Sequence, residues 1–324
     1  MTGPGPGPAL EGDAGPVPGE EPRAKVTSVR VGVGLLLGII TVLVLVVDVL
    51  LAGKPAFRVA APGCGLLLAA LSAAALLEFY ALLERAGIPS HARYGALASA
   101  FLLALRAILP AAGVRAGDAA ALALVGGLLA VLGPAWSAIG FRPRDGENQD
   151  GPGTLRPLAG TALGLLLVHF PIALLLELRL VPDLPGVHSP GPAGLLLATM
   201  VVLACKAGDS AAYFVGRTVG RTPLCRVSPK KTWEGAVGGT LAGTAAGAAL
   251  GGAFGLPLTH GITLALLANL AGQGGDLLES WVKRACGAKD SGSTFGEMGG
   301  ALDLVDALLL AGPAGFLFHQ VVLN

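Results

Sequence analysis

The sequence predicts an all-α integral membrane protein that crosses the bilayer about nine times, and three observations lead to this prediction. Of the 324 residues, 53% are hydrophobic and only 13% are charged, whereas a soluble domain carries about 25% charged residues. Apolar stretches of about 20 residues, long enough to span a bilayer as a helix, recur along nearly the whole chain. Lysine and arginine also gather in alternate connecting segments. The net charge of +1 gives no general attraction to nucleic acid, which we do not expect as a partner.

The first 27 residues differ from the rest of the chain. Residues 1–27 are rich in Gly, Pro, Glu and Asp, and we expect them to form a disordered cytoplasmic tail. They lack the short basic start and the small-residue cleavage site of a signal peptide. The first apolar stretch is therefore expected to be retained as a membrane helix.

The predicted spans follow the apolar stretches in order. They are 31–51, 60–83, 95–113, 119–139, 158–176, 192–207, 235–254, 258–274 and 299–322. Most lysines and arginines outside the spans fall on the side of the N-terminus, and basic residues favour the cytoplasmic side of a membrane. We therefore expect the N-terminus to be cytoplasmic, together with two polar loops at about 208–234 and 275–298.

Several residues within the spans call for partners. Asp48 in the first span and Arg106 in the third are costly in hydrocarbon unless they are paired, and the sequence does not identify their partners. Glycines recur at every fourth residue from Gly235 to Gly251, which predicts close packing of that helix against another. The four cysteines show neither CxxC spacing nor histidines at zinc-ligand spacing, so we expect neither a disulfide framework nor a zinc site.

The first polar loop combines an aspartate with a basic run. Asp209 stands where the sixth span ends, and an aspartate there needs a cation or hydrogen-bond partners. Ser228, Lys230 and Lys231 directly precede the seventh span. Adjacent ammonium groups with nearby hydroxyls suit a polyphosphate. A basic patch attracted to anionic lipid is the alternative interpretation.

The second polar loop concentrates carboxylates. Asp276 and Glu279 are three residues apart, so a helix would place them on one face, and Asp303 and Asp306 repeat this spacing. Carboxylates at the ends of membrane helices are costly unless they bind a metal or pair with bases. Oxygen ligands beside a polyphosphate site suit Mg²⁺. The alternative is a set of salt bridges with the basic residues of this loop: Lys283, Arg284 and Lys289.

The residues from 280 to 306 resemble the signature of the phosphatidate cytidylyltransferases, also called CDP-diacylglycerol synthases. The signature begins with Ser-x-hydrophobic-Lys-Arg, matched at 280–284, and continues with the Lys-Asp pair at 289–290. It ends with His-Gly-Gly and Asp-Arg-x-Asp. Three further pieces fit the family: DSAAY at 209–213, SPKKTWEG at 228–235 and GQGGDLLES at 272–280. The N-terminal half resembles the family only in being hydrophobic.

Two positions depart from this signature. Met298 stands where the family has histidine, and Leu304 stands where it has arginine, between Asp303 and Asp306. Methionine cannot transfer a proton, and leucine cannot neutralise a phosphate or hold an aspartate. Both changes lie at the end of the site that is expected to bind metal.

The resemblance implies an enzyme of phospholipid biosynthesis. It would transfer a cytidylyl group from CTP to phosphatidate, or to a similar lipid phosphate, giving CDP-diacylglycerol and pyrophosphate, with Mg²⁺ as cofactor. The resemblance also implies a homodimer, and a bacterial inner (cytoplasmic) membrane fits the chain. Residues 28–190 would form N-terminal transmembrane helices, and residues 191–324 would form the catalytic transmembrane region.

The resemblance also assigns candidate roles to residues. The candidate catalytic residues are Asp276, Asp290, Asp303 and Lys283. The candidate substrate-binding residues are Asp209, Ser228, Lys230, Lys231, Arg284 and Lys289. The candidate metal ligands are Asp276, Asp303 and Asp306.

The two departures keep two other hypotheses open. One is a related enzyme that uses a different lipid phosphate. The other is a catalytically impaired paralogue that binds lipid or nucleotide. A transporter is disfavoured, because the charged residues cluster on one side rather than along a path through the bilayer.

Overall fold

The regular structure of the protein is helical. The computed structural model describes residues 39–44, 46–52, 60–114, 152–189, 191–296 and 299–324, and within them the only strand-like pairing is one isolated bridge between Pro223 and Thr232. The main helices are α2 (Pro62–Arg85), α3 (Ala92–Ile108), α5 (Pro152–Gly164), α6 (Phe170–Arg179), α7 (Ala193–Val219), α8 (Trp233–Ala253), α9 (Leu258–Ala285), α10 (Ala301–Val305) and α11 (Leu308–Phe318). Short 3₁₀ or π-helical turns extend α3 over Leu109–Ala112, join α5 to α6 over Leu165–His169, and follow α11 over His319–Leu323.

The described helices confirm a multi-pass membrane protein. Five helical segments are long and apolar enough to cross a bilayer: Pro62–Arg85, Ala92–Ala112, Arg156–Arg179, Ala193–Val219 and Ala301–Leu323. They correspond to five of the predicted spans, and a shorter apolar helix covers Ile39–Ala52. The predicted spans 235–254 and 258–274 also form helices, α8 and α9, which are not among the five. The tail at 1–27 and the span at 119–139 lie outside the described residues, so the total of nine spans and the orientation stay predictions.

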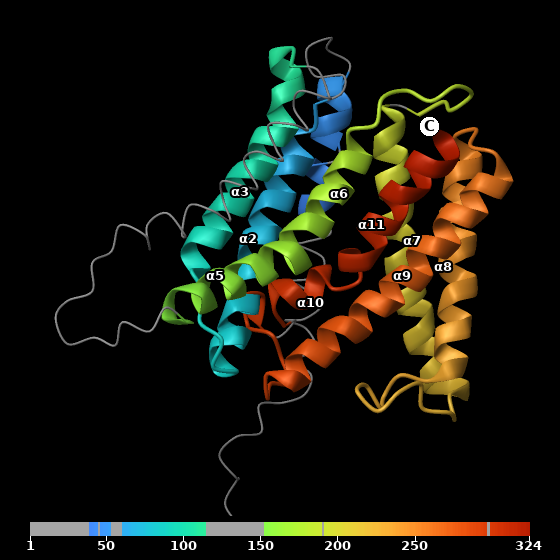
Figure 1. Cartoon of the computed structure of the whole chain (residues 1–324). Coiled ribbons are helices and arrows are strands. Elements are labelled where there is room, and N and C mark those ends of the chain that lie inside the picture. Colours follow the sequence, from blue (N-terminus) through green and yellow to red (C-terminus); the bar gives the residue numbers. More distant parts are fainter. Residues whose placement is uncertain (1–38, 45, 53–59, 115–151, 190, 297–298) are drawn as a thin grey trace, which may run out of the picture.

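The helices form two groups joined through the middle of the molecule (Figure 1). Helices α2 and α3 pack against each other on one side, and α7, α8 and α9 pack together on the other. Helices α6 and α11 lie between the two groups, and the short α10 packs against α2. The two groups therefore meet along α6, α10 and α11.

Two helices continue well past the predicted spans. Helix α7 runs to Val219 and α9 to Ala285, so the predicted loops at 208–234 and 275–298 were wrong for their first parts. Hydropathy marks where the apolar surface ends, whereas a helix continues as long as its backbone hydrogen bonds are made. Helix α9 ends just before Gly287, whose φ of 67° lies in the left-handed region that terminates helices. Asp209 and Asp276 therefore stand on rigid helices.

The structure supplies partners for Asp48 and Arg106. Arg106 on α3 makes a two-pronged contact with Glu177 on α6, with N···O distances of 2.6 and 2.7 Å. Asp48 is fully buried, faces Arg179 at 3.5 Å and accepts a hydrogen bond of 2.9 Å from the backbone of Gly63. These pairs lower the cost of burying the charges and tie α6 to the N-terminal helices.

The glycine stripe of α8 packs closely against another helix, as predicted, and the structure identifies that helix as α7. A Cβ atom at Gly239 would stand 2.7 Å from the carbonyl oxygen of Gly208, and one at Gly243 would stand 2.3 Å from that of Ala204. Glycine is therefore required at these positions, because any side chain would push the two backbones apart. The close approach places the start of α8 directly beside the polar end of α7.

This packing predicts a clear contrast between two glycines of α8. Gly243→Ala should lower the free energy of unfolding by about 1–3 kcal/mol, because the added methyl group collides with a backbone carbonyl. Gly252→Ala is the matched control: no atom lies within 4 Å of its Cβ position, so alanine should be neutral or stabilising by up to about 1 kcal/mol. Thermal unfolding in detergent measures both, and equal melting temperatures would contradict the packing described.

Candidate active site

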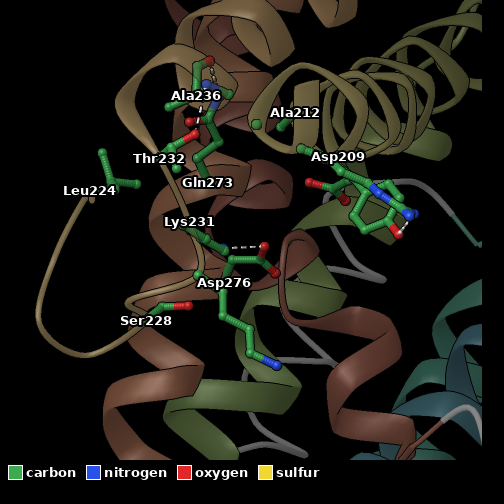
Figure 2. Close-up of a pocket in the computed structure, with 14 residues that line it drawn as sticks. Asp209, Ala212, Leu224, Ser228, Lys231, Thr232, Ala236, Gln273 and Asp276 are labelled. Atoms are coloured by element: carbon green, nitrogen blue, oxygen red, sulfur yellow. Dashed lines mark hydrogen bonds and ion pairs between the residues drawn. The ribbon is translucent and has the colours of Figure 1, made fainter. Parts of the chain in front are cut away.

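A pocket of about 440 Å³ lies between α7, the start of α8, the connecting loop 220–232 and α9 (Figure 2). In Figure 1 this loop lies at the end of the molecule opposite the C-terminus. The pocket is lined by Asp209, Ala212, Tyr213, Gly216, Arg217, Leu224, Ser228, Lys230, Lys231, Thr232, Gly235, Ala236, Gln273 and Asp276. Five of the predicted site residues thus meet in one cavity, although they come from separate parts of the sequence.

Backbone hydrogen bonds give the loop 220–232 a fixed shape. The N–H of Leu224 donates to the carbonyl of Lys231 at 2.7 Å, and the N–H of Trp233 donates to that of Thr222 at 3.0 Å. The Thr232 hydroxyl caps α8 by accepting the N–H of Gly235 at 3.1 Å. These hydrogen bonds therefore hold Lys230 and Lys231 in fixed positions at the pocket.

Glu234 fastens the beginning of this loop. Its carboxylate accepts the N–H groups of Arg221 and Thr222, each at 3.2 Å, and the Thr222 hydroxyl at 2.9 Å. Hydrogen bonds from its own backbone and from Thr222 and Arg221 lower the pKa of Glu234 to about 2. Because the pKa of Glu234 is lowered, its ionised carboxylate stabilises the loop fully at any pH above the ordinary glutamate range. This stabilisation is lost only as the pH falls towards about 2.

Helix α9 contributes Gln273 and Asp276 to the pocket, and a network of polar side chains holds Gln273 in place. The Asn269 side chain donates to the carbonyl of Ala204 at 2.7 Å, and Gln273 donates to Asn269 at 2.8 Å and to the Thr240 hydroxyl at 2.9 Å. Further along the same helix, the Asp276 carboxylate receives the Lys231 ammonium group at 2.5 Å (Figure 2). A lysine of the kind that binds phosphate is therefore in direct contact with an aspartate of the kind that binds metal ions.

Asp276 also meets a second carboxyl group. Asp306, which follows α10, shares a hydrogen bond with Asp276. Burial opposes ionisation of Asp276, but the hydrogen bond with Asp306 and the charge of Lys231 outweigh it and lower the pKa of Asp276. Two neighbouring, half-buried carboxylates repel each other when both are charged, so a cation bound between them would be favourable.

This donor set fits Mg²⁺ better than a metal held by protein ligands alone. Among the described residues, no group of three or more His, Cys, Asp or Glu side chains is placed to hold a metal. Magnesium is commonly bound by one or two carboxylates, with water and substrate phosphates completing its shell. The pair formed by Asp276 and Asp306 satisfies that requirement.

Asp303 lies in a neighbouring cluster. The Lys283 ammonium group is held between Glu279 and Asp303, at 2.6 Å from each. The other oxygen of Asp303 accepts the Ser291 hydroxyl and the N–H of Gly300, both at 2.8 Å, and so caps the start of α10. Burial raises the pKa of Glu279 to about 7 despite the contact with Lys283. Both oxygens of Asp303 are thus engaged in fixing the segment that leads to Asp306.

Sequence reasoning missed one residue of this cluster, Glu78 on α2. Its buried carboxylate accepts the Thr294 hydroxyl, the Ser291 hydroxyl at 3.2 Å and the N–H of Leu302 at 2.9 Å. A Cβ at Gly300 would lie 2.1 Å from this carboxylate. A lone glutamate in a predicted span was the available signal, because such a charge needs partners. The N-terminal helices therefore hold the signature segment in place.

The remaining predicted residues lie apart from the pocket lining. Arg284, Lys289 and Asp290 are exposed, and Arg284 donates to the carbonyl of Ala288 at 3.2 Å beyond the end of α9. Met298 lies outside the described residues. The structure thus brings together Asp209, Ser228, Lys230, Lys231 and Asp276 in the pocket, with Asp306 interacting with Asp276, and it places Lys283 and Asp303 in the neighbouring cluster.

The fold and the site together define a multi-pass helical membrane protein with a pocket suited to a phosphorylated substrate and a divalent cation. The sequence profile of the Cytidylyltransferase family matches residues 29–322, and the chain belongs to that family.

Curated relatives come from bacteria and plants. The chain is 44% identical over 115 residues to a phosphatidate cytidylyltransferase of Brucella suis, covering 35% of this chain and 43% of the relative. It is 35% identical over 142 residues to the chloroplastic phosphatidate cytidylyltransferase 5 of Arabidopsis thaliana, covering 43% of this chain and 36% of the relative. It is 40% identical over 114 residues to a phosphatidate cytidylyltransferase of Aquifex aeolicus, covering 34% of this chain and 41% of the relative. The matched stretch thus spans less than half the length of these relatives.

Proposed function

We propose that the protein transfers a cytidylyl group from CTP to phosphatidate, forming CDP-diacylglycerol and pyrophosphate. The observation that carries this proposal is the contact between Lys231 and Asp276 inside a pocket that also presents Lys230, Ser228 and Arg217. Such a pocket offers positive charge and hydroxyls for a triphosphate beside carboxylates for Mg²⁺. Family membership and the names of the relatives point to the same reaction.

The proposed reaction needs positioning more than proton transfer. An oxygen of the lipid phosphate would form a bond to the α-phosphorus of CTP, the bond to the β-phosphate oxygen would break, and pyrophosphate would leave. Since the attacking phosphate is already anionic near neutral pH, no strong general base is required. Lys230 and Lys231 would bind the triphosphate and stabilise the charge that develops as pyrophosphate departs.

We propose that Asp276 and Asp306 hold Mg²⁺, with Asp303 one helical turn from Asp306 as a third candidate ligand. When bound, the ion would supply charge neutralisation at the α-phosphoryl group and at the leaving pyrophosphate. Because Asp276 contacts the Lys231 ammonium group at 2.5 Å, the pocket would present a carboxylate to the ion and a cation to the triphosphate side by side. Lys283 would keep Asp303 oriented towards the site through its contact of 2.6 Å.

The topology completes the proposal. We infer that the pocket faces the cytoplasm, where CTP is present, because most basic residues lie on the predicted cytoplasmic side. A cytoplasmic N-terminus, nine spans, a bacterial inner membrane and a homodimer belong to the same proposal.

The first experiment identifies the lipid substrate. Purified protein in phosphatidate-containing vesicles should convert labelled CTP into a lipid-soluble product only when Mg²⁺ is present. Parallel vesicles with lysophosphatidate or a polyprenyl phosphate separate the proposed reaction from that of a related enzyme. Product with another lipid phosphate but none with phosphatidate would replace the proposed substrate, and no product with any of them would favour a binding paralogue.

The clamp on the basic loop predicts an effect on nucleotide binding. Glu234→Gln removes the charged acceptor of the Arg221 and Thr222 hydrogen bonds, so the lysines over the pocket should be held less firmly. We expect the KM for CTP to rise about fivefold. The KM for phosphatidate should stay unchanged, and so should both constants in the control Glu84→Gln, which alters an exposed glutamate of α2. An unchanged KM for CTP would show that the clamp does not shape the nucleotide site.

A further inference from the structure

The sequence lacks a positive charge at a position where the family signature has one. Leu304 stands between Asp303 and Asp306 in place of arginine, so this chain has no cation on its own α10 beside these carboxylates. Asp306 and Asp276 nevertheless lie near each other in a partly buried site. A group of carboxylates in such surroundings needs a compensating charge from elsewhere.

A lysine from another helix reaches the same position. The Lys206 ammonium group, on α7, donates to the carbonyl oxygen of Leu304 at 3.3 Å. This carbonyl is at the end of α10, which finishes at Val305, where helix carbonyls lack partners within the helix and attract cations. Lys206 therefore contacts the backbone of the residue that departs from the signature.

The same lysine also faces a carboxylate of the pocket. Its ammonium group lies 3.9 Å from Asp209, which lines the pocket together with Asp276. The other two lysines near these carboxylates have closer partners, since Lys231 contacts Asp276 and Lys283 contacts Asp303. The Lys206 side chain is 42% exposed, so it reaches the site from its open side and is not locked in the core.

We propose that Lys206 supplies from α7 the positive charge that the signature places at position 304, and thereby orients Asp306 towards Asp276. Lys206 is then a positioning residue: it pairs with Asp209 and fixes the break between α10 and α11 through the Leu304 carbonyl. This proposal rests on the proposed function, because it concerns the carboxylates assigned to magnesium.

The test removes the positive charge at position 206 and introduces one at position 304, where the signature has arginine. Lys206→Met should lower kcat/KM at least about tenfold, as expected for the loss of one hydrogen bond from a charged group. Lys206→Met/Leu304→Arg should recover activity to within about threefold of the wild type, because the arginine restores the charge from α10. A merely structural role for Lys206 would not be rescued by a cation on a different helix. Arg93→Met, at an exposed position of α3, controls for the general loss of a positive charge.

Two results would overturn the proposal: near wild-type activity in Lys206→Met, or a double variant no more active than Lys206→Met. If the wild type itself forms no product, the proposed function fails, and thermal unfolding decides this inference separately. Leu304→Arg should then raise the melting temperature in the Lys206→Met background and lower or not change it in the wild-type background. An equal shift in both backgrounds would show that the two positions do not share a charge site.

Discussion

Asp276→Asn is expected to reduce CDP-diacylglycerol formation on the order of a thousandfold, as when a group that stabilises charge in a transition state is removed. Asparagine keeps the shape of aspartate but removes the charge that pairs with Lys231 at 2.5 Å and that we assign to Mg²⁺. The loss should fall mainly on kcat, because the lysines that bind the triphosphate remain. Higher Mg²⁺ concentrations should recover only a small part of the activity, since a neutral amide is a poor ligand for this ion.

The measurement is the initial rate of product formation over a range of Mg²⁺ concentrations. Glu84→Gln removes one carboxylate from the exposed face of α2 and should behave as the wild type. Equal melting temperatures for Asp276→Asn and the wild type would show that the effect is local. If Asp276→Asn retained more than about a tenth of the wild-type activity, Asp276 would not be a ligand of the proposed metal site.

Glu78→Gln is expected to have the second large effect, acting on both stability and activity. Glutamine can accept from Ser291 or Thr294, but its NH₂ group cannot serve all three donors that the carboxylate serves. Each hydrogen bond to a charged group contributes about 1.5–3 kcal/mol, so a clear fall in melting temperature should follow. Activity should also fall, because Ser291 and Leu302 position the segment that carries Asp303.

Proteolysis separates this effect from general unfolding. In the wild type, Glu78 holds the segment after α9, so trypsin should cleave slowly at the exposed Lys289. In Glu78→Gln this site should be cut faster, while cleavage at Arg93 stays unchanged. Glu84→Gln, six residues along the same helix, should leave both rates unaltered. Equal cleavage at Lys289 in wild type and Glu78→Gln would show that Glu78 does not hold this segment.

The helical membrane class could be predicted because it depends on local composition. An apolar stretch long enough for the bilayer is visible in the sequence, whatever its neighbours are. The ends of α7 and α9 could not be predicted from hydropathy, because charged residues such as Asp209 and Asp276 interrupt the apolar pattern while the helix continues. The glycine stripe of α8 predicted a close contact correctly, although the partner, α7, emerged only from the structure.

The candidate site was predictable as a set of residues but not as an arrangement. Lys231 and Asp276 were both identified from their motifs, yet they are 45 residues apart and nothing local shows that they touch. Glu78 is 213 residues from Ser291, so only the fold reveals that it binds the signature segment. The sequence likewise showed the missing charge at Leu304 without showing that Lys206 approaches it. Residue types in a motif indicate which chemistry is possible, whereas the contacts between residues far apart in the sequence depend on how the helices pack.

The most direct test of the central claim follows the phosphates of CTP. Wild-type protein in phosphatidate vesicles with Mg²⁺ receives CTP labelled at either the α- or the γ-phosphate. We predict that the α-label enters the lipid, that the γ-label leaves as pyrophosphate in equal amount, and that Asp276→Asn does neither. Retention of both labels in intact CTP by folded wild-type protein, or entry of the γ-label into lipid, would contradict cytidylyl transfer at this site.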